Sequence, residues 1–318
     1  MFAESKLHQI TDKIHGTEFL SSLESELIST PIFYRLHDIY QSSTVYMTYP
    51  SNRTKRYEHS VGTMELAARM LFSSVTSADD ETRDAFFSVI DKKLQEIYNC
   101  VKSNCNSAIF NAIYLNDESK QLLNRCLNRA GREPWDVIGT IGHADDKFTV
   151  FRNMALDQFQ YYPVSTGNDN DPDGQEFRYY FCYRVLLQAV RIVALFHDVG
   201  HPPYSHIIEE VLTDLYEEAS GDEEKVAELK NILRPYISKD DAEAYKVSTP
   251  FTQKSLNIAT HERIGVHFLE TAISSVFPQI MSESWIQRET GIPRTVKTIM
   301  LYYVFVAEFT IAIFREAK

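Results

Sequence analysis

The segment FRYYFCYRVLLQAVRIVALFHDVGHPP, residues 177–203, decides the fold class of this chain. It is apolar over most of its length and carries neither glycine nor proline before Gly200, which predicts one long, buried helix. Gly200 and the pair Pro202-Pro203 then end the helix, because proline cannot continue it and glycine readily leaves helical geometry. The chain is therefore expected to be organised around helices.

The composition of the whole chain agrees with a helical globular protein. Its 318 residues are 44% hydrophobic and 24% charged, which excludes disordered, collagen-like and disulfide-rich classes. Only 11 residues are glycine, and few tight turns favour long helices over many short strands. We expect an all-α fold, a helical bundle with a helical insertion and at most a short β-hairpin.

Apolar residues at helical spacing predict several further helices. These begin at Arg56 and near His261, and extend over about 81–98 and 207–219. Ser77 followed by Asp80 is a capping signal for the helix at 81–98. Two stretches are expected outside helices: YMTYP (46–50) as a hairpin arm and the acidic run SGDEEK (220–225) as a solvated turn.

The most apolar segment, TIMLYYVFVAEFTIAIF, covers residues 298–314. It is close to the lower length limit for a membrane span and carries Glu308, whose charge is costly in lipid. We therefore expect a buried core helix and no membrane partner. The first residues have no apolar run typical of a secretory signal, and the four cysteines form no Cys-x-x-Cys pair. Reduced thiols in a cytoplasmic protein are the expected state.

Histidines and carboxylates gather in short stretches that suit a metal site. Imidazole nitrogens and carboxylate oxygens both offer lone pairs to a cation, and the pair His197-Asp198 offers both. His59, on another helix, is the best third ligand. This donor set suits Mn, Fe, Zn, Co or Ni better than Mg or Ca, although Mg can accompany a phosphate substrate. The alternative interpretation of His197-Asp198 is a plain ion pair.

Four stretches, in this order, resemble the HD-domain phosphohydrolases and among them the dNTP triphosphohydrolases, which include bacterial dGTPases and the mammalian SAM-and-HD-domain dNTPase. They are TPIFYRLHDIYQ (30–41), KRYEHSVGTMELA (55–67), ALFHDVGHPPYSH (194–206) and THERIGVHFLE (260–270). The similarity covers roughly residues 29–72 and 190–272. It implies an N-terminal segment with the first HD helix over 1–75, a helical insertion ending in a flexible loop over 76–175, and the HD core over 176–318.

The resemblance also implies a role for each matching residue. His59, His197 and Asp198 would bind the metal, and His261 would give a proton to the leaving oxygen, oriented by Glu209, where the family usually has Asp. The residues that would contact substrate are Gln41 at the sugar, Arg56 at a phosphate or the metal site, and His201 and His206 at the α-phosphate.

One part of the family pattern has no counterpart, because the sequence contains no Asp after Asp241 to act as the fourth metal ligand. We expect that ligand in a continuation of the chain. Glu308 is a substitute, or else a buried, paired carboxylate.

The resemblance implies hydrolysis of a dNTP to a deoxynucleoside and triphosphate, in a homo-oligomer. The alternatives are another HD phosphohydrolase, acting on a nucleoside monophosphate, cyclic nucleotide or alarmone, and a non-catalytic nucleotide-sensing module. A nuclease of this superfamily is disfavoured, because the net charge of −12 opposes binding to nucleic acid.

Overall fold

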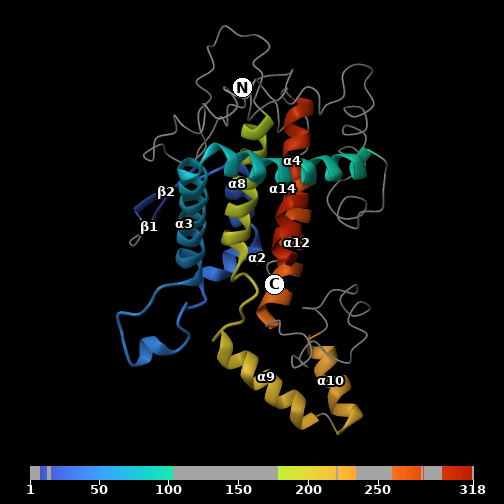
Figure 1. Ribbon diagram of the computed structural model, residues 1–318. Helices are drawn as coiled ribbons and strands as arrows, with labels where there is room; N and C mark the ends of the chain where they lie inside the picture. Colours follow the sequence, from blue (N-terminus) through green and yellow to red (C-terminus); the bar gives the residue numbers. More distant parts are fainter. Residues whose placement is uncertain are drawn as a thin grey trace.

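The computed structural model describes residues 8–12, 16–102, 178–219, 221–233, 260–280, 282 and 296–316. Within these ranges the fold is helical, with one antiparallel two-stranded hairpin, which confirms the expected fold class (Figure 1). The elements are β1 (His8–Asp12), β2 (Gly16–Leu20), α1 (Ser22–Ile28), α2 (Pro31–Tyr34), α3 (Arg56–Ser77), α4 (Asp80–Lys102), α8 (Arg178–Phe196), α9 (His206–Ala219), α10 (Glu223–Leu233), α12 (Thr260–Ile280) and α14 (Val296–Glu316).

Helix α8 is the centre of the core. It packs against α3, α4 and α14, and Figure 1 shows it between α3 and α14. Residues 181–189 of α8 are all buried, so no face of the helix is left for solvent over this stretch. The long buried helix expected from the sequence is therefore confirmed, and its C-terminal end is held in a fixed position inside the bundle.

Helix α14 completes the core on the other side of α8. Residues 302–311 are buried, and Phe305 and Phe314 are fully enclosed. Glu308 is buried in the same helix. Across the described ranges, no helix is long and apolar enough to cross a membrane. The expected core helix at 298–314 is confirmed, and its apolar surface packs against other helices of the same chain.

The N-terminal hairpin and α1 are joined to α8 by a buried ion pair. Glu24 accepts from Arg191 Nε at 2.6 Å and from Gln188 Nε2 at 2.7 Å. Glu24 also forms a capping box with Ser21 at the start of α1. The Glu24 carboxylate thus caps the N-terminus of α1 and also holds α1 against α8 in the core.

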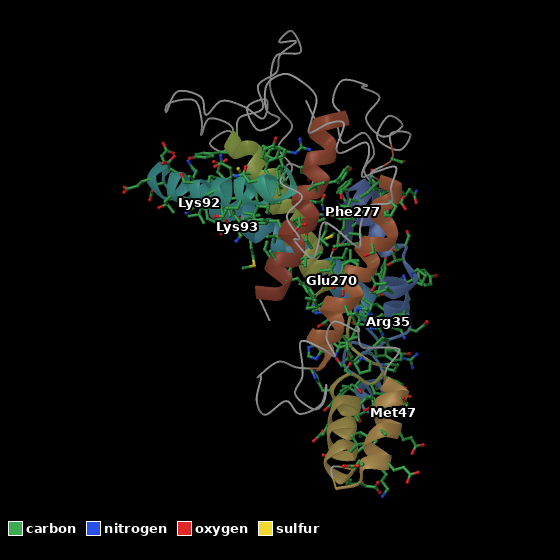
Figure 2. All side chains as sticks on the ribbon, turned by 90° about the vertical axis from the view of Figure 1, so that its right-hand side faces the viewer. Arg35, Met47, Lys92, Lys93, Glu270 and Phe277 are labelled. Atoms are coloured by element: carbon green, nitrogen blue, oxygen red, sulfur yellow. The ribbon has the colours of Figure 1, made fainter. Side chains whose placement is uncertain are left out.

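Helix α4 crosses the top of the core in Figure 1 and contacts both α8 and α14. It starts at Asp80, where the Asp79 carboxylate accepts from the Thr82 N–H at 2.8 Å. The cap is therefore Asp79, and not Ser77 as the sequence suggested. Leu94 of α4 is buried, whereas Lys92 and Lys93 lie on its outer face (Figure 2). The rest of the expected insertion, residues 103–175, lies outside the described residues.

Two local expectations from the sequence are wrong. The hairpin lies at β1 and β2, whereas residues Val45–Met47 form a 3₁₀ helix. Most side chains of 45–50 are exposed, so this stretch has no apolar face with which to pack as a strand. The acidic run is also more than a turn: the Asp222 carboxylate accepts from the N–H groups of Glu224 and Lys225, and α10 begins there.

Candidate functional site

The candidate site begins where α8 ends. The helix stops at Phe196, so His197 and Asp198 lie in the turn that follows it and not within the helix as expected. Phe196 and Val199 on either side are buried and anchor the turn. His197 Nδ1 lies 2.7 Å from the Ala194 carbonyl oxygen, which can only accept. Nδ1 therefore donates to this carbonyl, which leaves Nε2 for another partner.

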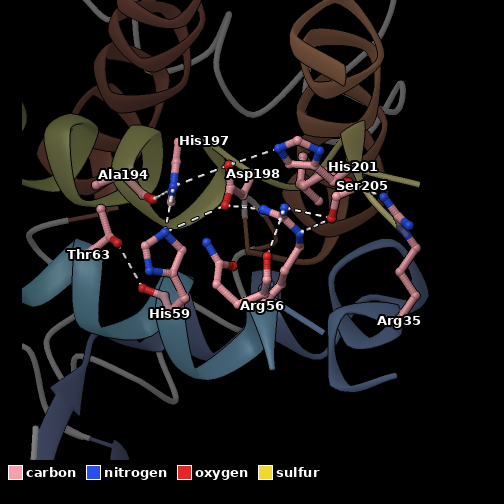
Figure 3. A network of polar contacts seen from close by, with 11 residues as sticks. Arg35, Arg56, His59, Thr63, Ala194, His197, Asp198, His201 and Ser205 are labelled. Atoms are coloured by element: carbon pink, nitrogen blue, oxygen red, sulfur yellow. Dashed lines mark hydrogen bonds and ion pairs between the residues drawn. The ribbon is translucent and has the colours of Figure 1, made fainter. Parts of the chain in front are cut away.

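His59, in the first turn of α3, faces His197 Nε2 (Figure 3). Its Nε2 lies 3.2 Å from His197 Nε2, and Thr63 Oγ1 donates to the His59 carbonyl at 2.8 Å. Two imidazole lone pairs at this distance repel one another, so a proton or a cation must lie between them. The structure thus brings His59 next to His197, and the role of His59 as a metal ligand stays a prediction.

Asp198 completes this group. Its carboxylate lies 3.6 Å from His59 Nε2 and 3.4 Å from His197 Nε2. One donor atom from each of the three residues lies within 4.8 Å of the others. We call His59, His197 and Asp198 the HHD group. Two imidazoles and one carboxylate are chemically suited to a divalent transition metal, and the half-buried histidines leave a side open to solvent.

Arg56 lies directly beside the HHD group. Its side chain is 3% exposed and donates to the Asp198 carboxylate through Nη1. The same guanidinium donates to Ser205 Oγ from Nε at 3.2 Å and from Nη2 at 2.8 Å. The resemblance implied either a phosphate or the metal site as the partner of Arg56. In this structure Arg56 contacts the carboxylate of Asp198, the hydroxyl of Ser205 and the backbone carbonyl of Gln41.

The charge states of the site follow from burial and from these contacts. Burial alone would raise the pKa of Asp198, but hydrogen bonds from His197 and His201 and the positive charge of Arg56 lower this pKa far below its usual range. Burial lowers the pKa of His201 to about 4. At neutral pH the site therefore holds an anionic Asp198 beside a neutral His201.

A second group of histidines lies next to the first. The rings of His201 and His261 stack at 3.8 Å and 14°, and His206 meets His201 edge-on at 4.8 Å. We call His201, His206 and His261 the three-histidine group. His201 Nε2 lies 3.4 Å from the Asp198 carboxylate and so links the two groups. Imidazole N–H groups gathered around an exposed edge can donate to the oxygens of an anion.

Two contacts bring α12, which carries His261, to this place. Gly200 lies so close to α12 that a side chain could not fit between them, since an added Cβ would be 1.8 Å from the His261 carbonyl oxygen. Arg35, which follows α2, donates to the Val199 carbonyl and lies over the Phe268 ring of α12 at 5.1 Å. Burial and nearby Arg56 lower the pKa of Arg35 to about 10.

Two of the expected site residues are placed less completely. The Gln41 carbonyl accepts from Arg56 Nη2 at 3.5 Å, so its backbone lies at the site, while its side-chain oxygen has no hydrogen-bond partner among the described residues. Glu209 lies in the first turn of α9, but its side chain falls outside the described part of the chain. Its pairing with His261 stays a prediction. Glu308 is in neither group of metal-binding side chains found in the described ranges.

The sequence reasoning missed Arg35 and Ser205. Both belong to stretches already singled out, TPIFYRLHDIYQ and GHPPYSH, but neither residue type by itself points to a site. Arg35 could have been suspected as a cation directly after the apolar run PIFY (31–34). No sequence signal could have shown that Ser205 is the acceptor for Arg56, because these two residues are 149 positions apart.

Comparisons with known proteins give a local similarity. The chain is 41% identical over 61 residues to the uncharacterized protein MJ1154 of Methanocaldococcus jannaschii. That stretch is 19% of this chain, and the chain spans only 14% of the length of that relative. No family model matches the chain. No solved structure matches it either.

Proposed function

We propose that the protein is a metal-dependent phosphohydrolase of the HD-domain superfamily that hydrolyses dNTPs to deoxynucleoside and triphosphate. The observation that carries this proposal is the HHD group, in which His59 approaches His197 across 138 residues of sequence. Such a gathering of metal-binding side chains is typical of catalytic sites, and plain ion pairs seldom include two facing imidazoles. The order of motifs in the sequence gives the finer assignment.

The HHD group is the proposed place of the cation, and its donor set fits Mn, Fe, Zn, Co or Ni. His197 Nδ1 donates to the Ala194 carbonyl, which leaves Nε2 as the nitrogen that a metal would bind. A bound divalent transition metal polarises a phosphoryl oxygen and makes a nucleophile available from water at neutral pH. Arg56 keeps Asp198 oriented and anionic until the cation binds.

The three-histidine group is the proposed place of the α-phosphate. It adjoins the HHD group through the contact between His201 and Asp198, so a phosphorus held there would lie beside the cation. Gln41, whose backbone contacts Arg56, is proposed to meet the sugar. This local set of donors needs no overall positive charge, which agrees with a small phosphate ligand and a net charge of −12.

His261 is the proposed proton donor to the leaving 5′-oxygen, with Glu209 as the carboxylate that orients it. His261 is half-buried and stacks on His201, so it adjoins the proposed phosphate position. A general acid must lie within reach of the leaving atom, and the contact of His261 with the proposed phosphate position supports this role.

The deciding experiment is an assay of the products formed from each of the four dNTPs in the presence of Mn²⁺. We expect stoichiometric inorganic triphosphate and deoxynucleoside from at least one of them. Release of orthophosphate or pyrophosphate, or hydrolysis of only monophosphates, cyclic nucleotides or alarmones, would assign the protein to another HD phosphohydrolase.

A non-catalytic nucleotide-sensing module is the second candidate, and one observation favours it. In the described ranges the HHD group offers three ligands, and Arg56 already neutralises one of them. A sensing module would bind a dNTP with measurable affinity and release no product, even with metal in excess. Equilibrium binding measured beside the product assay separates these two functions.

A homo-oligomer is also proposed, but its interface is not the helix at 298–314, because α14 is buried in the core of a single chain. Exposed apolar side chains lie instead on the outer faces of α3 and α4. They are Leu66, Met70, Phe86 and Val89. Light scattering at micromolar concentration tests for the oligomer, and a monomer would contradict it.

A further inference from the structure

We propose that Ser205 is a positioning residue, which fixes His206 of the three-histidine group by holding a left-handed turn against Arg56. Only the catalytic readout of this inference rests on the proposed function. Ser205 is 3% exposed and immediately precedes His206, the first residue of α9. Its position in the chain therefore sets the direction in which α9 leaves the site.

The backbone at this place is unusual. Tyr204 and Ser205 have φ values of 65° and 52°, in the left-handed region that side chains other than glycine seldom adopt. Such a conformation costs energy and persists only where the surroundings hold it. Two consecutive non-glycine residues in this region, directly before a candidate site residue, point to a turn that is held for a purpose.

The surroundings hold the turn at three points. The Ser205 hydroxyl accepts from Arg56 Nε and Nη2, and the Ser205 N–H donates to the Pro202 carbonyl at 2.9 Å. The Tyr204 carbonyl accepts from Ser43 Oγ at 3.0 Å. A serine before a helix usually turns its hydroxyl toward the first helical N–H groups. Here the left-handed backbone presents the hydroxyl to Arg56 instead.

Arg56 connects this turn to the HHD group. One guanidinium donates both to Asp198 and to Ser205, so the carboxylate and the turn before His206 are held by the same rigid, planar group. Arg56 thus links the HHD group directly to the turn that precedes His206. Loss of the Ser205 hydroxyl would free His206 to move while Arg56 still holds Asp198.

The test separates the effect of losing the Ser205 hydroxyl from the effect of changing the backbone conformation. Ser205→Gly removes the acceptor but tolerates a positive φ, so the turn can form without strain. Tyr204→Asn is the matched control, because asparagine tolerates the left-handed region and the Ser43 bond is to the backbone. The position of His206 is read from its ring C2–H resonance in ¹³C-histidine-labelled protein, assigned with His206→Gln, and dNTP turnover and metal content are measured beside it.

For Ser205→Gly we expect a shifted His206 resonance, at least tenfold lower turnover and unchanged metal content. Tyr204→Asn should match the wild type in all three. A wild-type resonance in Ser205→Gly, or equal changes in both variants, would overturn the inference. If the wild type hydrolyses no nucleotide, the proposed function fails, and the His206 resonance still decides the role of Ser205.

Discussion

Gly200 lies against the first turn of α12 with no room for a side chain, and a Cβ at Gly200 would be 1.8 Å from the carbonyl oxygen of His261. This approach joins the turn that carries Asp198 to the helix that carries His261. It also brings Gly200 close to the backbone nitrogen of Gly265, one turn further along α12. The two histidine-bearing elements are thus in backbone contact, and this close spacing depends on the fact that Gly200 has no side chain.

Gly200→Ala is expected to destabilise the protein by about 3 kcal/mol, because the added methyl meets backbone and not a flexible side chain. The measurement is the free energy of unfolding in urea. Gly221→Ala is the matched control, since nothing lies within 4 Å of a Cβ at Gly221. If both variants unfold at the wild-type urea concentration, the close approach of Gly200 to α12 is wrong.

Glu24→Gln is expected to cost roughly 3–5 kcal/mol of unfolding free energy, because it removes the negative partner of Arg191 where both side chains are fully buried. The glutamine keeps the size of the side chain, so the loss reports charge and hydrogen bonding. Calorimetry or urea unfolding measures it. The exposed pair Lys93–Glu96 is the control, and Glu96→Gln should change stability by less than about 0.5 kcal/mol. Equal effects would show that the Glu24 pair is not buried.

The pKa of His201 predicts how stability depends on pH in metal-free protein. Folding lowers this pKa from about 6.5 to about 4, so between these values the unfolded chain binds a proton that the folded chain excludes. Stability therefore falls as pH decreases from 6.5 to 4, by about 3 kcal/mol from this group. His201→Gln should remove that part of the decrease. Urea unfolding in EDTA at several pH values tests it, and parallel curves for both proteins would contradict it.

The helices were predictable because their signals are local. The apolar runs of α8 and α14 leave no face for solvent, and such a run predicts burial whatever surrounds it. The wrong predictions were also local: the turn chemistry of 46–50 resembles a hairpin, but among the described residues this stretch pairs with no strand, and Val45–Met47 forms a 3₁₀ helix.

The site was predictable only in part. His59, His197 and Asp198 could be named from their residue types and the order of motifs, since metal binding demands those types. The backbone contact of Gly200, the acceptor role of Ser205 and the bond from Arg35 to Val199 depend on how distant elements pack. No spacing in one sequence encodes such contacts, because they join residues more than 60 positions apart.

His59→Ala is expected to lower bound transition metal from about one equivalent to a small fraction, because each lost imidazole removes a ligand of the HHD group, and His197→Ala should do the same. Metal content is measured by elemental analysis after growth with Mn or Fe. His37→Ala is the control, since His37 is exposed and stacks on Tyr57. Metal lost equally in all three variants, or absent from the wild type, would contradict a metal at this place.

His261→Ala is expected to lower dNTP turnover by about a hundredfold or more while metal content stays at the wild-type value. The reason is positional: His261 stacks on His201 and is not a member of the HHD group, so its loss removes the proposed proton donor and leaves the three proposed metal ligands in place. Glu209, in the first turn of α9, is the carboxylate proposed to orient His261 for this role. Glu209→Gln should therefore reproduce part of the loss, and Glu210→Gln, its exposed neighbour on α9, should not.

A substrate whose leaving oxygen has a low pKa needs little protonation, and its turnover should fall far less in His261→Ala than that of a dNTP. Equal losses on both substrates would show that His261 acts in binding and not as the acid.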